Sequence, residues 1–536
     1  MSTSHRTSRA VPGAEDSTAG RGLGPPGADP LAGTEAAPLA DDGTGGEAAL
    51  PPRPLPQDDT PPPEPGDEAN GSGTTVRAVS ASGDQRIDGL LFGVAWNATS
   101  ISYSDPDAAS DYGSGYGSAD TDGDGLDAHE DGVAQISAGQ RTALHAALND
   151  FIYDQPAGGA GFSVEGFTAL GINYDGAGSG SGTIRVITSD DPSTAFAYLP
   201  TSAPVGGDVF LGPAASGDPT VAGNYEYYTL LHELGHALGL KHGHETDGFG
   251  ALPADVDSME FSLMTYRGFI GKDPATPLVN EQWGFAQSFM MLDIAALQHM
   301  YGADFTVNSG DTVYSWGPGS GETLVDGEVA ISPGANRIFA TVWDGGGTDT
   351  YDLSAYSGGV TVDLRPGMHS VFSDTQIADL DWSSSSSDRE ARGNIFNALQ
   401  YQGDARSLIE NAVGGAGPDS LTGNDADNRL TGGAGDDTLA GGAGDDTAVY
   451  AGNRGAYTVG GSTGSATVSG PDGADVLSGI EFLAFADQTL TLPEGSTPPD
   501  RISVAAAAAD RAEGDGGSTG FTFEVTRDGA AAGPAS

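Results

Sequence analysis

The sequence predicts a multidomain protein in which an α+β domain is followed by an all-β domain built as a parallel β-roll. One observation is the mixture of helix and strand patterns between residues 81 and 302, which is typical of α+β domains. A second is a nine-residue repeat in residues 414–449, which is typical of a parallel β-roll. Changes in composition then divide the chain into segments 1–80, 81–302, 303–496 and 497–536.

Composition narrows the functions that the chain can have. The 536 residues include 75 acidic and 21 basic side chains, for a formal charge of −54. Such a surface repels nucleic acid and anionic membrane, because phosphates need Lys or Arg to neutralise them. It suits hard cations held by carboxylate oxygens, although acidity that serves only solubility is the alternative. No cysteine is present, so disulfides and thiolate metal sites are excluded.

The N-terminal segment, residues 1–80, is rich in Pro, Gly and acidic residues and poor in aromatic ones. It cannot bury enough apolar surface to offset the entropy of ordering, so we expect disorder, and a removable propeptide fits this position. The segment lacks the apolar stretch of a secretory signal peptide. No stretch anywhere in the chain approaches the ~18 apolar residues of a membrane span, so we expect no membrane insertion.

Several elements are expected in residues 81–302. Residues 87–104 mix β-branched and aromatic residues with turn formers and predict one or two strands. Residues 137–154 open with a candidate Ser N-cap and carry apolar residues at helical spacing, so they predict an amphipathic helix. The remaining expectations are strands at "TIRVITS" and "DVFLG" and helices over residues 224–240 and 289–302.

The segment "LLHELGHALGLKHGHE" (230–245) predicts a metal site. His232 and His236 are four residues apart, so on a helix they share one face, with Glu233 beside the first histidine. Gly239 can end the helix with a positive φ, and a turn there can bring His242 back to the same metal. His244 matches no ligand spacing, so we expect it in the loop outside the metal's ligands.

Three imidazoles leave one position open, as a catalytic zinc requires. Zinc would activate water and polarise a substrate carbonyl, while Glu233 would serve as the general base. A buried helix end that happens to be rich in histidine is the alternative. Buried histidines usually come singly, whereas the pattern H-E-x-x-H-x-x-G-x-x-H is rare and is followed here by "SLMTYRG" with Met264.

An acidic loop precedes this region. In "DTDGDGLDAHED" the residues Asp120, Asp122, Asp124 and Asp131 match the spacing of an EF-hand loop, except that Asp replaces the final Glu. The pattern equally resembles the loops of thrombospondin-type calcium repeats. A calcium loop is therefore predicted, with a solvated acidic loop as the alternative, and His129 within it is expected at the surface.

Four adjoining nonapeptides, "GGAGPDSLT", "GNDADNRLT", "GGAGDDTLA" and "GGAGDDTAV", occupy residues 414–449. Their eighth residue is apolar and should point into the roll, which a flexible Gly/Asp linker would not explain. Glycine permits tight turns, and the sixth side chain can reach a calcium ion, so the roll should fold only when calcium binds. The predicted calcium-binding residues are Gly415, Gly417, Asp419, Asn428, Gly433, Gly435, Asp437, Gly442, Gly444 and Asp446, with Asp349 of the upstream copy "DGGGTDTYDLS".

Residues 86–490 resemble a serralysin-type metalloprotease, a bacterial metzincin with a C-terminal calcium-binding β-roll. The zinc motif, "IDGLLFGVAWN", "DIAALQHMYG", "IENAVGG" and the nonapeptides carry the resemblance, in the order of the family. The family usually has proline after the third histidine, where this chain has Gly243 and His244. After residue 497 the sequence predicts two strands around a polar loop and resembles the opening of a Calx-β domain, cut short.

The resemblance implies a metzincin catalytic domain in residues 81–302 and a β-roll or β-sandwich domain in residues 303–496. It implies one catalytic zinc on the three histidines, Met264 as the Met-turn residue, and Tyr266 as a phenol that ligates zinc at rest and then stabilises the oxyanion. Several structural calcium ions, protein or peptide substrates and type I-like export to the extracellular space are implied as well, and we expect a monomer. The alternative is a calcium-dependent adhesin or matrix protein, not an enzyme, with a vestigial zinc site.

Overall fold

The computed structural model describes residues 72–113, 116–149, 151–152, 155–156, 161–217, 220–384, 389–493, 501–506 and 523–528. Residues 1–71 of the segment predicted to be disordered lie outside this part of the chain. The rest of that segment is ordered, because β1 (Val76–Ala78) pairs antiparallel with β2 (Val94–Trp96). Order therefore begins earlier than the expected boundary at residue 80: backbone pairing, which composition does not reveal, holds β1.

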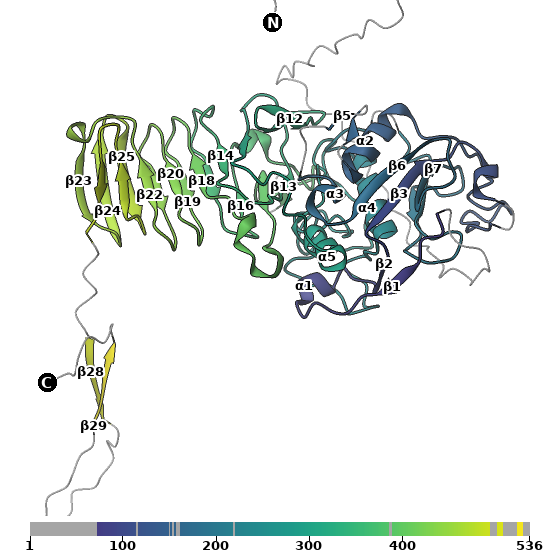
Figure 1. Ribbon diagram of the computed structural model, residues 1–536, viewed down its shortest axis with the longest axis horizontal. Helices are drawn as coiled ribbons and strands as arrows, with labels where there is room; N and C mark the ends of the chain where they lie inside the picture. Colours follow the sequence, from purple (N-terminus) through teal and green to yellow (C-terminus); the bar gives the residue numbers. More distant parts are fainter. Residues whose placement is uncertain are drawn as a thin grey trace, which may run out of the picture. The chain divides into compact units, whose positions relative to one another are not determined.

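Residues 81–302 are built around a twisted sheet with strand order β6-β3-β7-β9-β8 (Figure 1). All neighbours in it are parallel except β8 and β9. The expected strands at "TIRVITS" and "DVFLG" are confirmed as β7 and β9, whose residues are almost all buried because the sheet is covered on both faces. The strand bounds are β3 (Ser100–Asp105), β6 (Gly171–Ala177), β7 (Ile184–Thr188), β8 (Ala195–Ala197) and β9 (Asp208–Leu211).

The helices of this region are α1 (Gln85–Asp88), α2 (Ala138–Leu148), α3 (Val164–Phe167), α4 (Tyr225–Leu238) and α5 (Met291–Tyr301). Helices were expected where α2, α4 and α5 lie, and the Ser137 hydroxyl caps α2 by accepting from the backbone N–H of Gln140. The expected helix over residues 137–154 is too long. Asn149 leaves helical geometry, and the β-forming residues after it make a hairpin of β4 (Phe151–Ile152) and β5 (Gln155–Pro156).

Residues 303–493 are almost entirely β-structure, as the nonapeptides predicted. Within the described residues one sheet has the order β12-β11-β10-β14-β18-β20-β22-β26-β27, a second has β15-β19-β21-β25-β24-β23, and a third has β13-β17-β16. The bounds are β10 (Val313–Ser315), β11 (Thr323–Val325), β12 (Glu328–Ile331), β13 (Ala340–Val342), β14 (Thr350–Asp352), β15 (Thr361–Asp363), β16 (His369–Ser370), β17 (Ile395–Asn397), β18 (Asn411–Val413), β19 (Ser420–Thr422), β20 (Arg429–Thr431), β21 (Thr438–Ala440), β22 (Thr447–Val449), β23 (Thr458–Ser462), β24 (Ser465–Gly470), β25 (Gly473–Ser478), β26 (Phe482–Ala484) and β27 (Thr489–Thr491).

The repeat sets the pitch of the roll. Asn411 pairs in parallel with Arg429 and Arg429 with Thr447, so one turn takes 18 residues, or two nonapeptides. Successive copies therefore fall on opposite sheets. Figure 1 shows their short strands side by side along the roll. The expected inward eighth positions are confirmed, since their side chains are at most 1% exposed: Leu421, Leu430, Leu439 and Ala448.

Two ion pairs connect the α+β region to the β-rich region. Arg392 reaches Glu260, and Arg337 reaches Glu281, each through its guanidinium Nε. Backbone pairing between Val279 and Asp381 adds to them. Residues 260–281 are thus held against the segments that precede β13 and β17 of the β-rich part.

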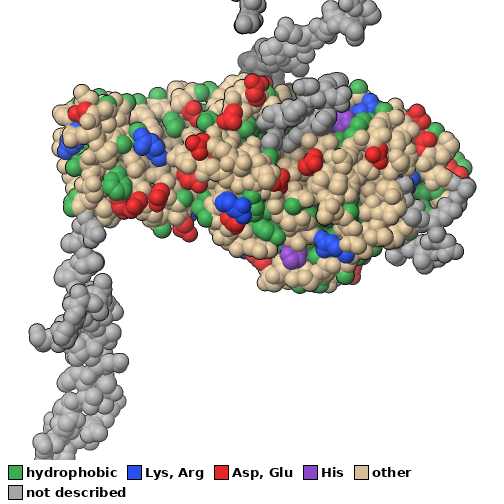
Figure 2. Space-filling view, viewed as in Figure 1, with side chains coloured by type: hydrophobic (Ala, Val, Ile, Leu, Met, Phe, Trp, Pro, Cys, Tyr) green, Lys and Arg blue, Asp and Glu red, His purple; other side chains and the backbone are tan. Residues whose placement is uncertain are grey.

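Two strands after residue 497 were expected and are confirmed as the antiparallel pair β28 (Arg501–Ala506) and β29 (Phe523–Asp528). No helix of the described residues combines the length and the apolar character that a membrane span needs. Acidic side chains outnumber basic ones in the sequence, and Figure 2 shows them scattered over one face.

Candidate metal centre

Helix α4 presents two of the three predicted metal ligands. It begins after Asn224, whose side chain accepts from the backbone N–H of Tyr227 at 2.9 Å, and it ends at Gly239 with φ of 111°. The left-handed glycine that the sequence predicted is thus in place, and the chain turns back over the helix end. His232 and His236 lie one turn apart on the same helix face, and His242 follows from the turn.

The three imidazoles converge on one point. The Nε2 atom of His242 lies 3.1 Å from that of His232 and 3.0 Å from that of His236, and the remaining pair is 3.2 Å apart. Ligand nitrogens at ~2.05 Å from a tetrahedral zinc would be about 3.3 Å apart, so the spacing fits such a metal. All three side chains are buried, with at most 8% of their surface exposed.

The other ring nitrogen of each histidine is held by an oxygen acceptor. Nδ1 of His232 donates to the carbonyl of Leu263 at 2.8 Å, and Nδ1 of His236 donates to the carbonyl of Leu240 at 2.9 Å. Nδ1 of His242 lies 2.9 Å from Oε1 of Glu245. These bonds place the proton on Nδ1 and leave the Nε2 lone pair for a cation.

Burial favours the neutral form of His232. Desolvation lowers the pKa of His232 well below its usual value, and the neighbouring rings of His236 and His242 lower it further. A neutral imidazole is the form that binds a metal. His232 is therefore in the form that binds a metal without first losing a proton.

The side chain of Glu233 is the strongest indication that the space beside the three histidines binds a ligand. Its side chain is fully buried, and neither carboxylate oxygen has a hydrogen-bond partner within the described part of the chain. Burial raises the pKa of this carboxyl to about 8. An unsatisfied buried carboxyl costs several kcal/mol in principle, so its retention points to a function instead of packing.

Tyr266 and His244 complete the wall beside His242. The ring centre of Tyr266 is 4.4 Å from that of His242 and 5.9 Å from that of His232. His244, expected in the loop outside the ligands, stacks on His242 at 5.5 Å and lies 5.1 Å from the Tyr266 ring. The structure thus brings Tyr266 to the ligands, and its role there stays a prediction.

The predicted Met-turn lies beneath the ligands. Met264 is fully buried, and a methyl group added at Gly235 of α4 would come within 2.5 Å of its sulfur, so the two are in close contact. Asp293 of α5 holds this turn, since its carboxylate accepts from the Ser262 hydroxyl at 2.6 Å and the Leu263 N–H at 2.8 Å. Leu263 in turn holds His232, so α5 supports the metal site through the turn.

The roll carries a second set of candidate ligands, arranged in two rows. In one row the carboxylate of Asp437 accepts from the N–H of Asp419 at 2.8 Å, and Asp475 accepts from Asp437 at 3.0 Å. In the other row Asp446 accepts from Asn428 at 2.8 Å, and Glu481 accepts from Asp446 at 2.9 Å. Asp475 and Glu481 lie outside the nonapeptides, so the repeat gave no signal for them.

Two of the calcium ligands predicted from the sequence have a buried oxygen without a hydrogen-bond partner in the described residues: Oδ2 of Asp349 and Oδ2 of Asp446. Burial and the neighbouring Asp349 raise the pKa of Asp344 to about 9. Burial likewise raises the pKa of Asp446 to about 6. Buried carboxyls this close together need a cation to stay ionised, which fits hard-cation binding.

The predicted glycines serve two purposes. Positive φ values of 101° to 133° occur at four of them: Gly433, Gly435, Gly442 and Gly444. Gly415 and Gly417 do not need that conformation, but a Cβ would come within 2.0 Å of the Tyr356 carbonyl oxygen at the first and 2.4 Å of Gly358 at the second. Close approach of the backbone between neighbouring turns therefore explains why glycine stands at Gly415 and Gly417.

The predicted calcium loop also gathers its carboxylates. Asp122, Asp124 and Asp131 can place one oxygen each within 4.8 Å of one another, and Asp120 and Asp122 do so with the buried Asp191. The loop's calcium binding stays a prediction. His129 is not at the surface as expected: it is 6% exposed, and its Nδ1 lies 3.0 Å from the Ser118 hydroxyl, because the loop packs its inner side on the sheet.

Comparison with known proteins finds a matching family model and several curated relatives. Residues 303–490 match the family model described as peptidase M10 serralysin C terminal. Serralysin of Proteus mirabilis is 34% identical over 212 residues, covering 38% of this chain and 37% of that protein. Metalloprotease AprA of Pseudomonas entomophila is 31% identical over 258 residues, covering 46% and 48%. Serralysin C of Dickeya chrysanthemi is 36% identical over 207 residues, covering 37% of each.

The resemblance to serralysin-type metalloproteases is therefore confirmed, and the mostly β C-terminal part is of the serralysin C-terminal type. The chain spans between 36% and 48% of the length of the curated relatives it matches. The matched family model covers the region after residue 302, so the metzincin type of residues 81–302 stays a prediction.

Glu245 is the residue of the site that motif analysis missed, although a carboxylate three residues after His242 was a usable signal. Replacing it by glutamine keeps the volume but weakens the acceptor for His242 Nδ1. We expect Glu245→Gln to weaken zinc binding by about 10-fold, at the lower end for partners of metal ligands. Competition against a chromophoric chelator measures this, and an unchanged zinc affinity would show that the bond to His242 has no effect on the site.

Proposed function

We propose that this chain, whose relatives include serralysins, is a secreted zinc endopeptidase that hydrolyses peptide bonds of extracellular proteins. The observation that carries the proposal is the convergence of three buried Nε2 atoms within 3.0–3.2 Å of one another, next to the unpartnered carboxylate of Glu233. A protein with only a structural use for this helix would gain stability by losing Glu233. The names of the relatives support the same reading.

In this proposal His232, His236 and His242 hold one zinc ion, and their Nδ1 bonds keep the rings oriented. Bound zinc supplies Lewis acidity toward a carbonyl oxygen and toward water. The chain's own groups carry the proton transfers and the recognition of charge. Three protein ligands leave room for these groups to act on a substrate.

Glu233 is the proposed general base. It sits on α4 between the two helical ligands, so its carboxylate lies next to the proposed metal, where it can accept a proton and return it. It accepts the proton of the attacking water and then delivers that proton to the nitrogen of the leaving amine. The absence of hydrogen-bond partners in the described residues leaves both oxygens available for this transfer.

Tyr266 is the proposed donor to the oxyanion. Its ring centre lies 4.4 Å from that of His242, so the side chain lies beside the proposed zinc ligands. A phenol that donates a hydrogen bond to the carbonyl oxygen stabilises the negative charge that develops there. Its alternative position as a zinc ligand at rest belongs to the resemblance.

The roll is proposed to bind several calcium ions through the residues predicted from the nonapeptides. The two buried unpartnered oxygens, on Asp349 and Asp446, support this because a cation between turns would satisfy them. Asp475, Glu481 and Asp344 extend the rows and join the proposed ligand set. The loop with Asp120, Asp122, Asp124 and Asp131 is a further proposed calcium site, supported by the clustering of its carboxylates.

Secretion, protein or peptide substrates and a monomeric state are part of the same proposal. The acidity of the chain argues against a nucleic-acid partner, because a formal charge of −54 repels phosphates. A calcium-dependent adhesin with a vestigial zinc site would use the roll equally well. It would not need the buried carboxyl of Glu233, so that alternative is less favoured.

Glu233→Gln tests the proposal directly. Glutamine has the shape of glutamate but cannot accept a proton, so we expect cleavage of a fluorogenic peptide to fall by at least about 10²-fold, with zinc content unchanged. Glu226→Gln, in the first turn of the same helix, is the matched control and should retain activity. Cleavage by zinc-loaded wild type that a chelator does not abolish, or full activity in Glu233→Gln, would contradict the mechanism.

Tyr266→Phe separates charge stabilisation from metal binding. Removing the hydroxyl should lower kcat by about 10²-fold, because a donor to the oxyanion acts only in the transition state, while KM and zinc affinity change little. Steady-state kinetics with the same peptide measure the two constants. An unchanged kcat would return Tyr266 to the role of a packing residue.

Calcium titrated into calcium-free protein tests the roll. We expect backbone amides of β18 to β22 to gain protection from hydrogen exchange as calcium is added, because the facing carboxylates repel one another without it. Amides of α4 in the same sample serve as the internal reference. Magnesium should give little protection, since it demands octahedral geometry; equal protection by both ions, or by neither, would argue against calcium sites in the roll.

A further inference from the structure

The chain has only two lysines, Lys241 and Lys272, and both are buried. Their exposed fractions are 2% and 6%, although lysine is rarely buried unless its charge is balanced. Every hydrogen bond that the described residues form with the two ammonium groups goes to an oxygen atom, and all but one of the acceptors lie in the loops that follow each lysine or precede Lys272. Lys241 bonds to the turn that carries His242, whereas Lys272 bonds to the loop that follows Tyr266.

The Lys241 ammonium has three backbone carbonyl oxygens around it. Nζ donates to Gly89 at 2.7 Å, to Glu245 at 2.8 Å and, at a longer 3.3 Å, to His242. Gly89 is the C-cap of α1, which lies about 150 residues earlier in the chain. The lysine thus connects the N-terminal part of the domain to both ends of the turn that supplies the third histidine.

This turn is the part of the site that has no regular secondary structure to support it. The N–H of Glu245 donates to the carbonyl of His242 at 3.2 Å, and the Glu245 carboxylate holds Nδ1 of His242. The turn therefore has one bond between backbones and one between side chains. The Lys241 ammonium bonds to the backbone carbonyls of both His242 and Glu245. It thereby stabilises the turn geometry in which the Glu245 carboxylate reaches the His242 imidazole.

We propose that Lys241 is a positioning residue for the third zinc ligand, His242, acting through the backbone of the turn from His242 to Glu245. The inference rests on the proposed zinc site. Its role is to hold Glu245 where the carboxylate fixes the His242 ring, so that Nε2 points at the metal before the metal arrives. Prearranged ligands lower the cost of ordering the site when zinc binds.

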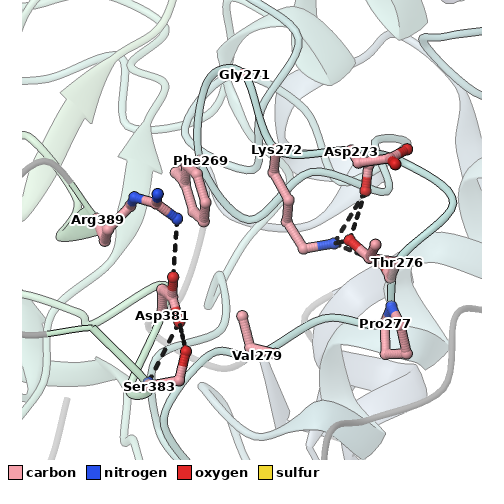
Figure 3. A pocket seen from close by; sticks show the side chains of 10 residues that line it. All are labelled: Phe269, Gly271, Lys272, Asp273, Thr276, Pro277, Val279, Asp381, Ser383 and Arg389. Carbon is pink, nitrogen blue, oxygen red and sulfur yellow. Dashed lines mark hydrogen bonds and ion pairs between the residues drawn. The ribbon is translucent and has the colours of Figure 1, made fainter.

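Lys272 provides a matched comparison within the same chain. Its Nζ donates to the carbonyl of Thr276 at 2.5 Å, to the Thr276 hydroxyl at 3.0 Å and to the carbonyl of Tyr266 at 3.4 Å. Figure 3 shows this ammonium directed at Asp273 and Thr276, on one side of a cavity of about 390 Å³ that Phe269 also lines. It is buried like Lys241, but its hydrogen bonds within the described residues go to Tyr266, Asp273 and Thr276 and not to the turn from His242 to Glu245.

Zinc affinity is the readout, measured by competition with a chromophoric chelator on the full chain. Lys241→Met removes the ammonium and keeps the apolar stem, so we expect the zinc dissociation constant to rise by about 10- to 100-fold. Lys272→Met should change the affinity by less than about 3-fold, although both variants lose a buried ammonium. Equal weakening in the two variants, or none in Lys241→Met, would overturn the proposal.

A double-mutant cycle with Glu245→Gln distinguishes positioning from a general loss of stability. If Lys241 acts through Glu245, the double variant should bind zinc about as weakly as the weaker single variant. Losses that multiply would show independent effects and would overturn the proposal. If the wild-type protein binds no zinc, the proposed function itself fails. If wild type and Lys241→Met bind zinc equally tightly, only the role of Lys241 fails.

The wild-type chain allows the same test should Lys241→Met fail to fold. With only two lysines, selective ¹⁵N labelling gives two side-chain ammonium signals. Adding zinc should slow hydrogen exchange at Lys241 and leave Lys272 unchanged, because only the turn with His242 becomes fixed. Equal responses at both lysines, or none at Lys241, would contradict the inference.

Discussion

The geometry of the third histidine is the constraint on which the rest of the candidate site depends. A helix can present two ligands on one face, but its straight axis carries the next residues away from the metal. The chain solves this at Gly239, where a left-handed φ of 111° ends α4 and returns the backbone across its own last turn. The segment between that glycine and α5 contains no helix or strand, so its backbone must be ordered by contacts from elsewhere.

Those contacts come from three directions. Lys241 ties the turn to the C-cap of α1, and Gly243 donates to the carbonyl of Met264 in the turn below. Asp293 of α5 fixes that lower turn through Leu263, which also holds His232. The site is thus a meeting point of segments from residues 89 to 293, and a change in any of them reaches the ligands through one or two hydrogen bonds.

The candidate metal centre and the roll share one electrostatic feature, which is buried carboxyl groups without hydrogen-bond partners among the described residues. Glu233 at the metal centre and Asp349 and Asp446 in the roll are buried carboxyls with oxygens that no described residue satisfies. Each raises the free energy of the metal-free fold, because burial disfavours the charged form. A cation would relieve the strain in both regions, which is consistent with a chain whose acidic side chains exceed the basic ones by 54.

Local patterns predicted the parts of this arrangement that depend on local spacing. The cap at Gly239, the shared face of His232 and His236 and the buried eighth residues of the roll follow from helix and repeat geometry. Other features depend on partners distant in sequence. The helix expected to reach residue 154 ends at Leu148 because the residues after it prefer a hairpin, and His129 is buried because its loop packs on the sheet.

The lysines show why composition was least informative near the site. The sequence contains only two lysines, and no motif near residue 241 indicated a role for one of them. Three carbonyl oxygens that converge from two segments accept a compact ammonium with three donors, whereas the planar guanidinium of arginine would fit that arrangement poorly. The choice of residue thus follows from the shape of the acceptor set, which exists only once residues 89 and 245 have been brought together by folding.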